Sequence, residues 1–153
     1  MSFEVQSAAR VEIEDRPPIN PTPAQKRGLK YQARVEAELE RLYPGRVLLR
    51  PWFRYKVAWR HKTCQPDAII LDSDLLPAVI VEIKYSTIRD AWHKLSTIYK
   101  PVVEKAYRRP LGLTLITRLF DPHVGFPCSV EQLEGLEHLA SFSGEGLGVV
   151  SWK

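Results

Sequence analysis

Cysteine and long hydrophobic runs are both scarce in this chain. Two cysteines, Cys64 and Cys128, occur in 153 residues, which is a thiol content typical of proteins from a reducing compartment. The first residues do not resemble a secretion signal, and no apolar run approaches the roughly 18 residues that a membrane span requires. We therefore expect a cytoplasmic protein that makes no contact with a membrane.

Several common catalytic motifs are also missing. The chain has no glycine-rich phosphate loop and no G-x-S-x-G element, which argues against a bound nucleotide cofactor and against a serine hydrolase of that type. It contains no internal repeat, and its apolar content of 44% and charged content of 26% are ordinary for a soluble domain. A chain of this length can bury a single hydrophobic core.

The first 23 residues lack a helical pattern and contain four prolines. Proline is excluded from helix interiors, and this segment has no sustained hydrophobic period. We predict an extended N-terminal arm over residues 1–23, lying on the body of the protein or on a partner subunit. A single domain over residues 24–153 follows it.

Acidic residues are absent from residues 46–62, whereas six cations lie there. Aromatic side chains, Trp52 and Trp59 among them, are interleaved with these cations. Such a mixture suits a phosphate backbone with exposed bases, although cations also extend over the hydrophobic face of a solvated strand. We predict nucleic-acid contacts by five of the six cations: Arg50, Arg54, Lys56, Arg60 and Lys62.

Residues 66–85 contain two apolar, β-branched runs, 68–71 and 78–83, separated by turn-forming residues. This pattern predicts two short strands joined by a tight connection. We expect them to pair antiparallel about a centre between Asp74 and Leu75.

This pairing would place Asp67 opposite Glu82, with Lys84 on the same face as Glu82 because strand side chains alternate. Two close carboxylates repel each other unless a cation lies between them, and Mg²⁺ takes one or two carboxylates together with waters and phosphate oxygens. A lysine beside them can orient an attacking water or stabilise charge on a phosphate. The alternative is an exposed edge strand, but the hydrophobic flanks favour a buried one, where unpaired charge is costly.

The sequence Pro66-Asp67, followed after fourteen residues by Glu82-Ile83-Lys84, resembles the PD-(D/E)xK signature of the restriction-endonuclease-like nuclease superfamily. The resemblance implies an α/β fold with a core of αβββαβ order. In that core a central mixed sheet is flanked by helices.

The order of the predicted elements agrees with that core over residues 24–120. It begins with a helix over 24–42, a strand over 47–57 and a basic connection over 59–65. The hairpin, a helix from Thr87 and a strand over 111–120 follow. Pro51 should bend the first strand or confine it to an edge, and Pro101 should kink or restart the second helix. Beyond it we predict a loop over 121–127, a helix over 130–140 and a strand over 146–152. The crossover helix predicts parallel pairing of the third and fourth strands of the core.

The resemblance also implies roles for single residues. Asp67 and Glu82 would hold Mg²⁺, for which Mn²⁺ can substitute, and the carbonyl of Ile83 would be a further ligand. Lys84 would position the attacking hydroxide.

Helical residues would complete such a site. On the first helix, Glu36 is the first candidate for a water-mediated contact with the metal, and Gln32, one turn earlier, is the second. Polar or basic residues of the next helix would support the site, with three candidates: Lys94, Tyr99 and Lys100.

These expectations favour a Mg²⁺-dependent DNA endonuclease that selects branched or junction DNA, because the chain has no appended domain for base readout. It is similar in this respect to small Holliday-junction-resolvase-like and phage endonucleases, which act as homodimers in bacterial or phage-infected cells. A restriction-type or exonucleolytic nuclease and a catalytically silent DNA-binding module of the same fold are the alternatives. A zinc site from His61, Cys64, His123 and Cys128 is disfavoured because the ligand pairs are far apart in sequence.

Overall fold

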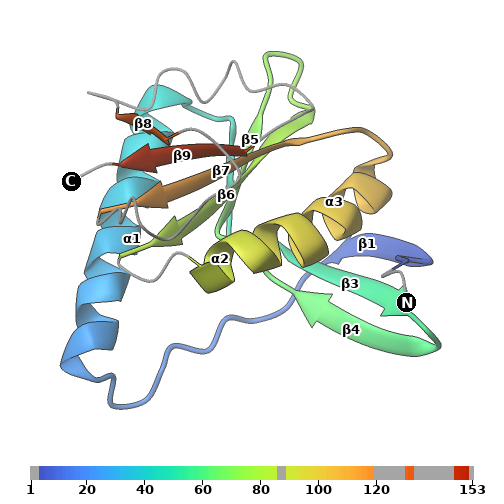
Figure 1. Ribbon diagram of the computed structural model, residues 1–153, viewed down its shortest axis with the longest axis horizontal. Coiled ribbons are helices and arrows are strands. Elements are labelled where there is room, and N and C mark those ends of the chain that lie inside the picture. The colour runs from blue at the N-terminus through green and yellow to red at the C-terminus, as the bar shows by residue number, and fades with distance from the viewer. Residues whose placement is uncertain (1–3, 86–88, 119–129, 133–146, 152–153) are drawn as a thin grey trace.

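A six-stranded mixed sheet forms the centre of the molecule, with helix α1 (Pro23–Leu42) on one face and a second helical segment on the other (Figure 1). The computed structural model describes residues 4–85, 89–118, 130–132 and 147–151. The second helical segment consists of α2 (Arg89–Lys94), the π-helical turn η1 (Leu95–Tyr99) and α3 (Lys100–Tyr107). The α/β class predicted from the sequence is confirmed.

The central sheet has the strand order β2-β5-β6-β7-β9-β8. Its antiparallel part contains β2 (Val47–Leu49), β5 (Ala68–Leu71) and β6 (Pro77–Lys84). Its parallel part joins β6 to β7 (Gly112–Thr117), β9 (Leu147–Ser151) and β8 (Val130–Gln132). Because β6 and β7 are parallel neighbours on either side of the second helical segment in sequence, that predicted pairing is confirmed.

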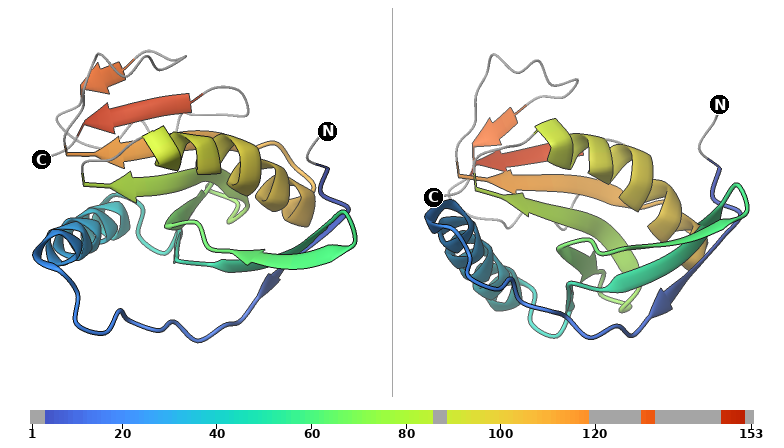
Figure 2. Two further views of the ribbon diagram at one scale, coloured as in Figure 1. Left: turned by 60° about the horizontal axis from the view of Figure 1, so that its bottom comes forward. Right: turned by 90° about the horizontal axis from the view of Figure 1, so that it is seen from below.

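A smaller antiparallel sheet has the order β1-β3-β4. It is formed by β1 (Ser7–Val11), β3 (Trp52–Val57) and β4 (Arg60–Cys64). Figure 2 shows this sheet beside the α3 end of the second helical segment, with α1 on the other side of the central sheet. The predicted arm is therefore extended, and part of it is the edge strand β1.

Helix α1 begins at a capping box. The Thr22 side chain accepts a hydrogen bond from the backbone N–H of Gln25 at 3.2 Å, and the Gln25 side chain accepts one from the Thr22 N–H at 2.8 Å. Its buried face presents Tyr31, Val35 and Leu39 to the sheet. The helix predicted over residues 24–42 is confirmed.

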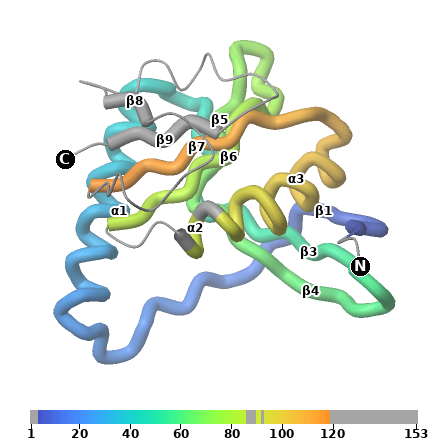
Figure 3. The backbone as a smooth tube through the Cα atoms, in the orientation of Figure 1, coloured from blue at the N-terminus to red at the C-terminus, as the bar shows by residue number. Residues whose placement is uncertain are grey.

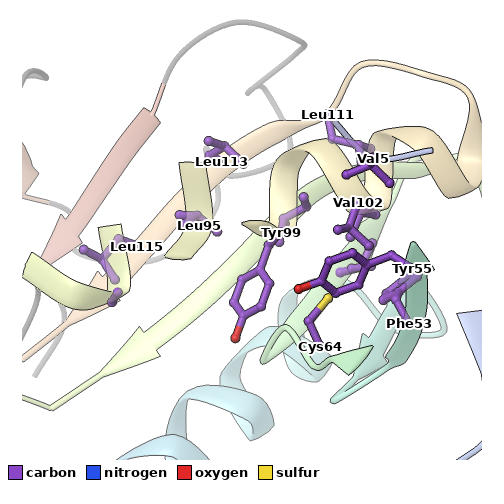
Figure 4. Packing of buried hydrophobic residues seen from close by; sticks show 14 residues of the cluster. Val5, Phe53, Tyr55, Cys64, Leu95, Tyr99, Val102, Leu111, Leu113 and Leu115 are labelled. Atoms are coloured by element: carbon purple, nitrogen blue, oxygen red, sulfur yellow. The ribbon is translucent and has the colours of Figure 1, made fainter. Parts of the chain in front are cut away.

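The alternation along β6 divides the core into two halves. Val79 and Val81 pack on the α1 side, whereas Ile80 packs with Leu95 and Val102 on the other. Figure 4 shows the second half, where the helical segment covers β7 and the small sheet. Both faces of β5, β6 and β7 are therefore covered, which explains why these strands read as hydrophobic runs and do not alternate with polar residues.

The β5–β6 hairpin has the predicted register. Ala68 pairs with Val81 and Ile69 pairs with Ile80. A bulge between Ile70 and Leu71 shifts the pairing near the turn. The alignment at the far end of the hairpin, next to Asp67, is unaffected by that shift.

The single strand predicted over residues 47–57 is wrong. The chain forms β2 in the central sheet and then β3 in the smaller sheet, with a change of direction between them. Arg50 adopts a left-handed conformation with φ 49°, and Pro51 has no N–H to continue a ladder. The two residues together move the chain from one sheet to the other.

Two further predictions are corrected by strands. The basic connection over residues 59–65 is the strand β4, whose residues are exposed except for Cys64. Its position at a sheet edge leaves no hydrophobic alternation that would reveal a strand. Residues 130–132 form β8 and not the start of a helix; the rest of that predicted helix and the loop over 121–127 lie outside the described residues.

The turn between β3 and β4 contains two residues, Ala58 and Trp59, with φ 47° and 69°. Two-residue hairpin turns of this kind require positive φ at both positions and strongly favour Asn and Gly there. A residue with a Cβ pays on the order of 1–2 kcal/mol in that conformation. The tip of this hairpin is therefore strained.

The second helical segment is interrupted next to Pro101, where the sequence predicts a kink or a restart. The π-helical turn η1 ends at Tyr99 and α3 restarts at Lys100, with Pro101 in its first turn. Proline lacks the N–H for a normal helical bond. The predicted start at Thr87 lies outside the described residues. Within the part of the chain that the structure describes, no helix is long and apolar enough to cross a membrane.

Candidate active site

Asp67 and Glu82 lie side by side where β5 begins. Because Ala68 pairs with Val81, the residues next to this pair face each other across the hairpin, and their carboxyl groups are within hydrogen-bonding reach. Oδ2 of Asp67 also accepts a hydrogen bond from the backbone N–H of Ile83 at 2.7 Å. The predicted juxtaposition of the two acids is present, and we refer to them as the carboxyl pair.

Burial makes Glu82 an unusual acid. The residue is 4% exposed, and burial raises the pKa of its carboxyl well above the ordinary value. The neighbouring Asp67 raises this pKa further, whereas the positive charges of Lys84 and Lys94 lower it. In the metal-free protein the carboxyl pair therefore favours a state with one proton, and a cation would have to displace it.

Residues from the second helical segment approach the carboxyl pair. The positive charge of Lys94 lowers the pKa of Glu82. Burial raises the pKa of the Tyr99 phenol, and the nearby charges of Glu82 and Asp67 raise it further. Figure 4 shows Tyr99 directed away from its helix, with its hydroxyl at the end of the cluster. Two of the three supporting residues proposed from the sequence thus lie at the site.

Lys100, the third, has other partners. Its Nζ lies 2.9 Å from Oε2 of Glu104 and 3.4 Å from the carbonyl oxygen of Leu111. The same Glu104 oxygen accepts a hydrogen bond from the Leu111 N–H at 2.7 Å. Lys100 therefore joins α3 to the chain entering β7.

Both first-helix candidates lie beside Asp67. Nε2 of Gln32 donates a hydrogen bond to Oδ1 of Asp67 at 3.3 Å. Burial raises the pKa of Glu36, and the charge of Asp67 raises it further. The charge of Arg50 and a hydrogen bond from Gln32 act in the opposite direction, but the net shift is upward. Gln32 makes the direct contact, and Glu36 is the second carboxylate that faces Asp67.

Arg50 connects the backbone of the site. Its N–H donates to the Asp67 carbonyl at 2.8 Å, and its own carbonyl accepts from Nε2 of Gln65 at 3.0 Å. The left-handed conformation of Arg50 therefore occurs directly beside the carboxyl pair, where backbone strain has functional precedent. The other four predicted nucleic-acid contacts, Arg54, Lys56, Arg60 and Lys62, lie on β3 and β4.

The arm is fastened to this region by Asp15. Its Oδ1 accepts hydrogen bonds from Nε1 of Trp52 at 2.9 Å and from Nε2 of Gln65 at 2.7 Å, and its Oδ2 lies 4.0 Å from Nε of Arg50. The hydrogen bond from Trp52, followed by that from Gln65, lowers the pKa of Asp15. Sequence reasoning did not identify Asp15 or Gln65, because only the tertiary path brings them together.

Two clefts meet at the arm. The larger has a volume of 690 Å³ and includes Asp67 in its lining. The smaller has a volume of 220 Å³ and includes Lys84. Both are also lined by the same residues of the arm and α1: Pro18, Leu29 and Gln32. Asp67 and Lys84 of the sequence motif thus line two neighbouring clefts that share a wall at the arm and α1.

The donor set fits a hard divalent ion. No group of three or more His, Cys, Asp or Glu side chains among the described residues is arranged to hold a metal. Mg²⁺ does not need such a group, because it binds through one or two carboxylates and completes its shell with waters and phosphate oxygens. The partly buried Asp67 and the buried Glu82 would supply the two carboxylates.

The alternative zinc site gains no support. His61 and Cys64 both lie on β4, but His61 is exposed whereas Cys64 is buried, and burial raises the pKa of the Cys64 thiol to about 12. A thiol of that kind is a poor metal ligand at neutral pH. His123 and Cys128 lie outside the described residues.

Comparison with protein-family models, with curated proteins and with solved structures found no match. The assignment of a function therefore depends on the residues of this chain and on their geometry.

Proposed function

We propose that this protein is a Mg²⁺-dependent nuclease that hydrolyses phosphodiester bonds in DNA. The observation that carries the proposal is the carboxyl pair, in which a buried Glu82 faces Asp67 with Lys84 two residues further along the same strand. Two acids placed together in a largely apolar sheet are costly. Binding a metal ion gives that arrangement a physical reason.

The restriction-endonuclease-like core is part of the same proposal. Helix α1, strands β2, β5 and β6, the second helical segment and β7 follow one another in αβββαβ order, with the β3–β4 hairpin inserted after β2. The sheet they form is mixed and has helices on both faces. This order and the position of the acids at a strand end are compatible with that core.

Each residue of the site has a role in this proposal. Asp67 is held by the Ile83 N–H and by Gln32, so its carboxylate is oriented before a metal arrives. Asp67 and Glu82, with the Ile83 carbonyl, would hold Mg²⁺, and Glu36 would act through a bound water. A bound Mg²⁺ supplies Lewis-acid polarisation of the phosphate and a lower pKa for a coordinated water.

Lys84 acts directly on the reacting groups. Its ammonium orients the attacking water and stabilises the charge that develops on the phosphate oxygens. Attack by the water oxygen forms a new P–O bond, and the P–O bond to the leaving sugar breaks. The leaving oxygen takes up one proton, which gives a phosphate monoester and a free hydroxyl.

The cations of the small sheet support DNA as the substrate. Arg54, Arg60 and Lys62 are exposed, and residues 46–62 contain no acid. Neutralised phosphates release counterions, which makes such binding strongly dependent on salt. A homodimer, by analogy with the enzymes that the motif resembles, stays a prediction that light scattering can test.

One assay tests the proposed reaction. Supercoiled plasmid, linear duplex and a four-way junction are incubated with the protein in Mg²⁺, in Mn²⁺ or in chelator. We expect cleavage that requires the metal, and we expect Asp67→Asn, Glu82→Gln and Lys84→Ala each to lower the rate by at least about 100-fold while the protein stays folded.

The matched controls are exposed residues of the same types. Asp74 lies in the turn of the same hairpin and Glu12 lies in the arm, and both are exposed. The variants Asp74→Asn and Glu12→Gln should cut like the wild type. Cleavage that survives in purified Glu82→Gln would contradict the proposal. DNA binding without cutting in any metal would identify the silent binding module instead.

A further inference from the structure

The tip of the β3–β4 hairpin presents an aromatic side chain to solvent. Trp59 is 84% exposed and occupies the second position of the two-residue turn, with φ 69°. Exposure leaves most of the apolar surface of this ring in water, where it contributes little to folding. Neither the strain of the turn nor the exposure of the ring stabilises the fold, so Trp59 is available for a contact outside it.

Positive charge surrounds this ring. Nζ of Lys56 lies 5.3 Å from the centroid of the Trp59 ring, and the residue after the tryptophan is Arg60. Cross-strand pairing places Lys56 beside His61 and Tyr55 beside Lys62, so cations lie on both faces of the hairpin. A ribbon with this charge would meet a polyanion favourably, whereas an ordinary protein surface would offer it no comparable complement.

We propose that the β3–β4 hairpin is a DNA-binding ribbon in which Trp59 stacks on a base that is unpaired or exposed at a branch. The neighbouring cations contact the flanking phosphates. An intact duplex keeps its bases stacked on each other, so only DNA with an accessible base face gains the aromatic contact. This inference takes DNA as the ligand from the proposed function, and it assigns to the ribbon the selection of branched or bulged DNA.

The length of the ribbon sets the distance between recognition and cleavage. Trp59 and Asp67 are separated by eight residues, which can span at most about 28 Å when fully extended. At about 3.4 Å for each nucleotide along a strand, this is about eight nucleotides. Cleavage should therefore occur within about eight nucleotides of the stacked base.

Binding in chelator tests the proposal without any need for catalysis. Fluorescence anisotropy compares a labelled intact duplex with the same duplex carrying a three-nucleotide bulge. We expect wild-type protein to prefer the bulged DNA, and Trp59→Ala to bind it about 5- to 100-fold more weakly with little change for the duplex. Trp59→Phe should retain part of the preference because it keeps an aromatic face.

The matched control is Leu75→Ala. Leu75 is 60% exposed and also lies in a hairpin turn with positive φ, 63°, but on β5–β6; its substitution should leave binding unchanged. Arg60→Ala should weaken binding to both DNAs equally and reduce the slope of log affinity against log salt by about 1.

Two results would overturn the proposal. One is a Trp59→Ala protein with normal thermal unfolding and an undiminished preference for bulged DNA. The other is self-association of the wild type that Trp59→Ala abolishes, with DNA binding unaffected, because the ring would then contact a second copy of this chain. This inference and the proposed function can fail separately. A wild-type protein that cuts DNA but does not prefer the bulged duplex contradicts this inference alone. A wild-type protein that prefers the bulged duplex but cuts no DNA contradicts only the proposed function.

Discussion

A single buried acid sets the electrostatic character of the site. Glu82 is placed by strand register among hydrophobic neighbours, and Asp67 is fixed beside it by the Ile83 N–H and Gln32. Because burial and Asp67 both raise the pKa of Glu82, the metal-free fold carries a proton there that the unfolded chain would lose near neutral pH. The residue is therefore a source of instability that a bound cation would relieve.

This property predicts how stability depends on pH. The pKa of Glu82 is higher in the folded protein than in the unfolded chain. Its contribution to the free energy of unfolding is therefore complete below about pH 4.3, the unfolded pKa, and is lost as the pH rises through the folded pKa. In chelator, Glu82→Gln should melt about 3 °C higher than the wild type at pH 8, with a difference that shrinks toward pH 5. Calorimetry across this range is the measurement.

Glu12→Gln is the control, since Glu12 is an exposed acid of the arm. Its melting temperature should follow that of the wild type at every pH. A difference between Glu82→Gln and wild type that stays constant from pH 5 to pH 9 would mean that Glu82 is not the titrating group.

At the scale of elements, local hydrophobic patterns predicted the parts of the sheet that are buried. The β5–β6 hairpin and the register that pairs Asp67 with Glu82 followed from two apolar runs and a turn. Strand β4 was missed because its residues are exposed and basic, and the division of residues 47–57 between two sheets depends on tertiary contacts made by Arg50. The sequence left Glu36 and Gln32 as alternatives because both lie on the side of α1 that faces Asp67.

The strained β3–β4 turn predicts how substitutions at positive φ change the free energy of unfolding. Ala58→Gly removes the Cβ at φ 47°, and it should raise the free energy of unfolding by about 1 kcal/mol, measured by urea denaturation. The opposite change, Gly45→Ala at φ 72°, should lower it by a similar amount. No change in either variant would show that these turns relax without cost.

At the scale of the whole molecule, the arm connects the small sheet to helix α1. Figure 3 traces it from β1, at the edge of the small sheet, along the outside of the body to the start of α1. Its attachment in the middle depends on the hydrogen bonds that Asp15 accepts from Trp52 and Gln65. This path could not be predicted from the sequence, because no local pattern links a proline-rich segment to residues 37 and 50 positions away.

The attachment predicts a change in protease sensitivity. Asp15→Ala should increase the rate of cleavage after Glu12 by a glutamate-specific protease several-fold, because the arm loses its contacts in the middle while the core is unaffected. Mass spectrometry of a time course identifies the cut. Glu14→Ala removes the neighbouring exposed acid and should leave the rate unchanged; equal acceleration by both substitutions would refute a specific role for Asp15.

The arm forms part of the wall of both clefts. Pro18 lines the cleft that includes Asp67 and the cleft that includes Lys84, and Asp15, three residues earlier, fastens the arm to Trp52 and Gln65. In the proposed nuclease, release of Asp15 would therefore widen the entrance for DNA without changing any residue of the carboxyl pair.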